Sequence, residues 1–211
     1  MDVFAKFPLV LAAALLLTGE RGACAARPPR PDPFAAVLNE MLDNKMPGWD
    51  AIAAAAAQME RAGPCLEPCR AMRDLAGVYD SMAHRSYPNS MTRPPHFDWD
   101  AFYREHERDI RHVLGRHPAR APLYCAILAK VAAHVGGEDL REMTFWTVEA
   151  AARLDRPGRD CLGPVLAALP RTPEEAATLS ELRDGCRADL SKPVLGSAWC
   201  TRFLQRPRDP R

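Results

Sequence analysis

Two cysteines four residues apart are the residues whose type and spacing most directly suggest chemistry. Cys65 and Cys69 lie in the stretch GPCLEPCR at residues 63–70, each directly after a proline. Two thiolates joined by a histidine suit copper, so one interpretation is a metal site at Cys65 and Cys69. In an oxidising compartment such a pair is usually a disulfide instead. We favour the disulfide and keep a periplasmic copper-binding protein as the alternative.

A second cluster of ionisable side chains lies between residues 102 and 117. Glu105, Asp109 and His112 are spaced at i, i+4 and i+7, so one helical face would carry all three. Carboxylates and histidine at such spacing bind metals between helices, but arginines alternate with them here. A solvated, salt-bridged surface is therefore the favoured interpretation.

The chain lacks the short motifs that mark common catalytic sites. Neither a nucleophile elbow, nor the HExxH of zinc proteases, nor a phosphate-binding glycine loop occurs in it. No residue is therefore assigned a catalytic role, and no cofactor is predicted. An enzyme is the less favoured interpretation, and a hydrolase whose site leaves no motif is kept as a further alternative.

The first 25 residues have the composition of a secretory signal peptide. Lys6 is followed by an apolar run at residues 7–17, and small residues stand at positions 23 and 25. The run is shorter than the roughly 20 apolar residues that a membrane helix needs. We expect cleavage after Ala25 and a periplasmic or secreted protein that does not span the membrane.

The chain after residue 25 keeps an even number of cysteines, which in an exported protein indicates disulfides. The six are Cys65, Cys69, Cys125, Cys161, Cys186 and Cys200. A local pattern, in which each cysteine pairs with its neighbour along the chain (65–69, 125–161, 186–200), is slightly favoured. Cys186 and Cys200 in particular suit a staple between consecutive helices. The rival pattern sends Cys65 or Cys69 to the second half of the chain.

Apolar residues recur at helical spacing through most of the chain, and no region alternates in the manner of a strand. The predicted fold is all-α: a compact irregular bundle of eight or nine helices stapled by disulfides. A tetratricopeptide-like stack of helix hairpins is the alternative. The predicted organisation is a signal peptide at 1–25, a proline- and arginine-rich leader at 26–33, a single helical domain at 34–204 with a long loop at 86–97, and a basic tail at 205–211.

Three local signals place helices within this domain. Pro68 is tolerated only in a first turn, so a helix should begin at about Cys65 to Glu67. Residues 121–135 are apolar on nearly every side, which predicts a central helix. The stretch TPEE at 172–175 is a capping box that begins another helix. Four positions of that helix are predicted to face inward: Leu179, Leu182, Cys186 and Leu190.

Charge and composition limit the kind of partner. Basic and acidic residues number 28 and 27, a formal net charge of +1, so bulk charge predicts no nucleic-acid binding. We expect an exported, disulfide-stabilised helical protein that binds another macromolecule, most simply a protein, in an inhibitor, immunity or envelope-adaptor role. Tyr87 and Phe97, at the loop 86–97, are the predicted partner-binding residues because aromatic side chains are favoured at interface hot spots.

Overall fold

The computed structural model describes residues 33–44, 46, 48–85, 108, 110–137, 140–190 and 198–206. The side chains of residues 33, 34, 81–85 and 189 are outside this description. Backbone contacts divide the chain into residues 1–30 and 31–211, and every described residue belongs to the second unit. The predicted signal peptide and the loop at 86–97 therefore lie outside the described residues.

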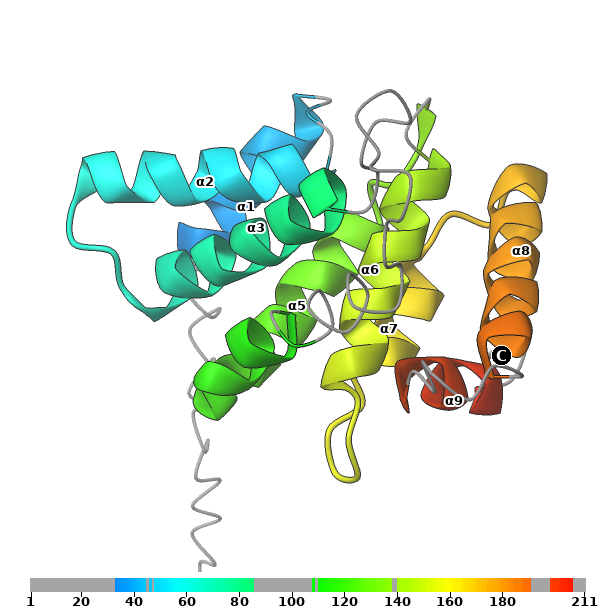
Figure 1. Ribbon diagram of the computed structural model, residues 1–211. Helices are drawn as coiled ribbons and strands as arrows, with labels where there is room; N and C mark the ends of the chain where they lie inside the picture. Colours follow the sequence, from blue (N-terminus) through cyan, green and yellow to red (C-terminus); the bar gives the residue numbers. More distant parts are fainter. Residues whose placement is uncertain are drawn as a thin grey trace, which may run out of the picture. The chain divides into compact units, whose positions relative to one another are not determined.

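The described part of the chain is built from helices (Figure 1). In chain order they are α1 (Pro33–Asp43), α2 (Gly48–Ala62), α3 (Glu67–Arg85), the 3-10 helix η1 (Pro118–Arg120), α5 (Ala121–Ala132), α6 (Leu140–Leu154), α7 (Leu162–Ala168), α8 (Pro173–Leu190) and α9 (Ala198–Gln205). Residues 110–116, which precede η1, are helical too. The predicted all-α fold is thus confirmed for the residues that the structure describes.

Two of the helix starts follow from the local signals in the sequence. The helix α3 begins at Glu67 with Pro68 in its first turn, where the missing N–H of proline costs no intrahelical hydrogen bond. The helix α8 begins at Pro173, and the backbone N–H of Glu175 donates to Thr172 Oγ1 at 3.1 Å. This bond satisfies one of the N–H groups that a helix start leaves without a partner.

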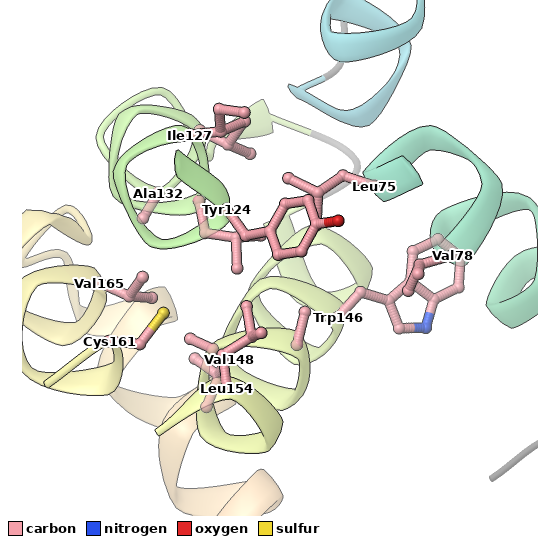
Figure 2. Packing of buried hydrophobic residues seen from close by; sticks show 14 of the residues in the cluster. Leu75, Val78, Tyr124, Ile127, Ala132, Trp146, Val148, Leu154, Cys161 and Val165 are labelled. Atoms are coloured by element: carbon pink, nitrogen blue, oxygen red, sulfur yellow. The ribbon is translucent and has the colours of Figure 1, made fainter. Parts of the chain in front are cut away.

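The helix α5 is the centre of the packing, as its nearly uniform apolar composition predicts. It contacts α2, α3, α6 and α7, and its residues Tyr124, Ile127 and Leu128 are fully buried. Figure 2 shows side chains of several helices that meet in this core, among them Leu75 of α3 and Val165 of α7. Burial of one large apolar side chain contributes roughly 1.5–3 kcal/mol, so this contact region supplies much of the stabilisation of the fold.

Three disulfides staple the helices, in the local pattern that the sequence analysis slightly favours. They are Cys65–Cys69, Cys125–Cys161 and Cys186–Cys200, with Cα atoms 5.3, 5.0 and 5.2 Å apart. The first closes the start of α3, the second joins α5 to the residue before α7, and the third joins α8 to α9. No described helix has the length and apolar character needed to cross a membrane.

Two expectations about individual residues need correction. Leu190 does not face inward: it is 38% exposed, and it is the last residue of α8, where a helix ends and its contacts with neighbouring helices diminish. The basic tail does not begin at 205, because α9 continues to Gln205 and the side chain of Arg206 pairs with two aspartates. These first two residues of the predicted tail belong to the folded domain.

Candidate functional site

A pocket of about 320 Å³ lies among the helical residues 110–116, η1, the start of α5, the end of α6, the turn after α6, and α9. Its cationic wall consists of five arginines: Arg111, Arg153, Arg156, Arg159 and Arg202. No acidic residue is among the described residues that line it. Five positive charges thus gather at one pocket in a protein whose net charge is only +1, although Arg153 is neutralised in part by its ion pair with Glu149.

The remainder of the pocket wall is largely apolar. It is formed by Leu114, Pro118, Ala121, Leu154, Ala198 and Trp199, together with the backbone of Gly115. Apolar walls with a few converging polar groups are typical of ligand sites, and the volume is at the lower end of their usual range. The pocket thus offers guanidinium groups and an apolar surface to the same ligand.

The turn between α6 and α7 brings two of the arginines to the pocket. The backbones of Arg156 and Arg159 exchange hydrogen bonds of 3.1 and 2.9 Å, and this closes the turn. Gly158 adopts a positive φ of 82°, a conformation in which a side chain would be strained. The tight turn therefore places Arg156 and Arg159 next to each other, with both side chains at the pocket wall.

An ion-pair network holds this turn in place. Arg206 donates from Nη2 to Asp155 Oδ2 at 3.0 Å and to Asp160 Oδ1 at 2.7 Å. One guanidinium therefore binds the residue before the turn and the residue after it. Asp155 Oδ1 also accepts the backbone N–H of Cys161 at 2.9 Å and that of Leu162 at 3.2 Å. Asp155 is 8% exposed, and it fixes the path of the chain from α6 into α7.

The carbonyl end of α6 orients two of the pocket arginines. Arg159 donates from Nε and Nη2 to the carbonyl oxygen of Leu154, at 3.0 and 2.8 Å. Arg202 of α9 donates from Nε to the carbonyl oxygen of Ala152 at 2.6 Å. The last carbonyls of a helix have no intrahelical partner and carry partial negative charge, so they attract these cations.

The five arginines differ in how far they are already engaged. Arg153 is paired with Glu149 one turn earlier in α6, and its side chain is only 10% exposed. The guanidinium of Arg156 and Nη1 of Arg159 have no hydrogen bond or ion pair with any residue that the structure describes. These two groups are therefore the donors that the pocket offers most directly to a ligand.

Two of the three disulfides involve cysteines close in sequence to residues that line the pocket, and Cys65–Cys69 is linked to the lining through an ion pair. Cys161 follows the arginine turn directly, and Cys200 lies between Trp199 and Arg202 on α9. The Cys65–Cys69 disulfide is linked to the pocket through Glu67, which lies inside the loop that this disulfide closes. Glu67 pairs with Arg120, which directly precedes the lining residue Ala121.

Arg120 also belongs to a partly buried polar group behind that wall. Its Nη1 donates to Asp74 Oδ2 at 2.9 Å, and the hydroxyl of Tyr124 donates to the same oxygen at 2.6 Å. Burial and the neighbouring Asp74 carboxylate both raise the pKa of Tyr124 above its usual range. The phenol therefore stays protonated and continues to donate, and the group ties η1 and α5 to α3.

The two cysteines of the predicted copper site, Cys65 and Cys69, lie close together and next to one carboxylate. Ligand atoms of Glu60, Cys65 and Cys69 are all within 4.8 Å of one another, and Glu60 pairs with Arg73 at 3.1 Å. The two sulfur atoms are bonded to each other in a disulfide, so neither is a thiolate that binds copper. No histidine joins this group among the described residues. The arrangement is that of a structural staple at the start of α3.

Most of the other predicted residues cannot be placed in the fold. Tyr87, Phe97, Glu105 and Asp109 lie outside the described residues, and His112 is exposed. Sequence reasoning did not single out the arginine pocket, although Arg153, Arg156 and Arg159 follow one another at intervals of three. No family model, curated protein or solved structure was found that matches this chain.

Proposed function

We propose that this protein is an exported, disulfide-stabilised binding protein, and that its arginine-lined pocket receives an acidic group of a partner protein. One observation carries the proposal: five arginines converge on one pocket, and no described acidic residue lines it. Arginine is favoured at protein–protein hot spots because its planar guanidinium binds carboxylates through two parallel hydrogen bonds. The even set of disulfide-bonded cysteines and the composition of residues 1–25 support export.

Export is tested by the mass of the protein recovered from the compartment outside the cytoplasm. A chain that begins at Ala26 and is six hydrogens lighter than its reduced form is the expected product, since three disulfides remove six hydrogens. Recovery of an uncleaved chain with free thiols in the cytoplasm would contradict export. A chain only four hydrogens lighter, with bound copper, would favour the metal alternative at Cys65 and Cys69.

Partner binding is tested by charge reversal in the pocket. Crosslinking in the native compartment is compared between the unchanged protein and the double variant Arg111→Glu, Arg156→Glu, both of which are exposed. The matched control is Arg73→Glu, Arg187→Glu, which makes the same change of charge on exposed helical surfaces outside the pocket. We expect a crosslinked partner that the pocket variant loses and the control keeps. Equal crosslinking by both variants would remove the pocket from the proposal.

A further inference from the structure

We propose that the acidic group bound in this pocket is the C-terminal carboxylate of a peptide chain whose last residue is apolar. This inference rests on the proposed function, because it names the part of the partner that enters the pocket. It starts from the two kinds of side chain that line the pocket, which are arginines and the apolar residues Leu114, Leu154 and Trp199.

The number of available donors favours a carboxylate. Of the five arginines, Arg159 uses two donors on the carbonyl of Leu154, and Arg111, Arg153 and Arg202 also interact within the protein. Arg156 and Nη1 of Arg159 remain as groups without a partner among the described residues. Because both residues line the same pocket, these groups together offer N–H donors to the two oxygens of one carboxylate. The engaged arginines still contribute a positive potential that attracts the anion.

The size of the pocket favours a chain end over an internal acidic segment. A volume of about 320 Å³ corresponds to about ten water molecules at roughly 30 Å³ each. A terminal residue places its carboxylate and its side chain on the same carbon atom, so both reach the pocket together. A glutamate side chain carries only two methylene groups before its carboxylate and would leave the surface near Trp199 and Leu114 without an apolar partner.

Bound in this way, the terminal carboxylate lies against Arg156 and Arg159, and the apolar side chain packs against Trp199 and Leu154. Desolvation of that side chain adds binding free energy in proportion to the area buried. The rest of the peptide leaves through the mouth of the pocket. The site therefore recognises the end of a chain through its charge and its last side chain.

The test uses a short peptide, acetyl-Ser-Gly-Ser-Gly-Leu, in three forms, with binding measured by calorimetry in a buffer of low ionic strength. The forms are the free acid, the C-terminal amide, and an amide in which the last leucine is replaced by glutamate. We expect the free acid to bind at least about tenfold more tightly than either amide, since a charge-assisted hydrogen-bond pair is lost in the first and the apolar contact in the second. N-acetyl-leucine and phenyl phosphate are the small-molecule arms.

Matched variants locate the binding. Arg156→Gln should weaken binding of the free acid about tenfold, and Arg187→Gln, an exposed residue of α8 outside the pocket, should leave it unchanged.

The inference would be overturned if the free acid and the C-terminal amide bound equally well, or if the affinity for the free acid were unchanged in Arg156→Gln. So would binding of phenyl phosphate as tight as that of the acid, whereas N-acetyl-leucine carries both recognised groups and should bind about as tightly as the acid. If the glutamate amide binds best, the inference fails and the proposed function stands. If no form binds and charge reversal leaves crosslinking intact, both fail.

Discussion

Arg120 and Glu67 are 53 residues apart in the chain, and two parallel hydrogen bonds join them, Nε to Oε2 at 2.6 Å and Nη2 to Oε1 at 3.2 Å. The hydrogen bonds and charge of Arg120, together with those of Arg70, outweigh the opposing effect of burial and lower the pKa of Glu67. Because the Cys65–Cys69 disulfide encloses Glu67, this ion pair connects the most local of the three disulfides to the wall of the arginine pocket.

Replacement of Arg120 by glutamine should destabilise the protein by about 2 kcal/mol, chiefly because the partly buried Asp74 loses its cation. Urea unfolding measures this change, and Arg70→Gln is the control. Arg70 also pairs with Glu67, at 3.2 Å, but the side chains of Arg70 and Glu67 are both about half exposed, so the substitution should have a much smaller effect. Equal effects of the two substitutions would show that the contact with Asp74 contributes nothing.

The three disulfides should contribute unequally to stability. In the chain-entropy model the loops of 36, 14 and 4 residues correspond to about 4, 3 and 2 kcal/mol for Cys125–Cys161, Cys186–Cys200 and Cys65–Cys69. Paired alanine substitutions, compared by chemical denaturation without reductant, measure the order of the three stabilising effects.

The variant that lacks the Cys186–Cys200 disulfide should also lose affinity for the pocket ligand, because that disulfide holds Trp199 and Arg202 in place. Full affinity in that variant would count against this supporting role.

The stability of the protein should fall in acid partly through Asp155. Burial alone would raise the pKa of Asp155, but the hydrogen bonds from the Cys161 and Leu162 amides and from Arg206 outweigh it and leave the pKa lowered. A carboxyl with a lowered pKa in the folded state takes up protons first in the unfolded state. Its stabilisation is therefore complete above about pH 4 and is lost as the pH falls through the folded-state pKa.

The variant Asp155→Asn isolates the ion pair with Arg206, since the amide oxygen still accepts the two backbone N–H groups. We expect a loss of about 1–2 kcal/mol at pH 7 that shrinks as the pH is lowered towards 2. Asp160→Asn is the control, because Asp160 is more than half exposed and its pair with Arg206 is screened by solvent. A difference between wild type and Asp155→Asn that stays constant with pH would contradict the assignment.

A last prediction concerns Tyr87 and Phe97, which lie outside the described residues and whose role rests on the sequence alone. Their replacement by alanine should weaken partner capture several-fold and leave the melting temperature nearly unchanged, as expected for hot-spot side chains that pack on a partner. Crosslinking and thermal unfolding of the same preparations measure the two effects. Normal capture by the double variant would end this part of the hypothesis.

Local patterns predicted the helices well, because caps, prolines and apolar periodicity act within a few residues. The positions of Pro68 and Thr172 set the starts of α3 and α8, and the apolar residues 121–135 became the central α5. The inward orientation of Leu190 was predicted wrongly, because periodicity does not say where a helix stops packing against its neighbours. The role of Arg206 was missed because its partners lie about 50 residues earlier in the chain.

By itself, the sequence determined an all-helical chain with cysteines in numbers that suit three disulfides, since both properties follow from local spacing and composition. Only the tertiary structure decided where charge accumulates. Arg153, Arg156 and Arg159 are near neighbours in the chain, but Arg111 and Arg202 reach the same pocket from elements far away in sequence. Convergence of these like charges depends on how α6 and α9 pack and on the carbonyl groups that orient the guanidiniums. Neither can be predicted from a local sequence pattern.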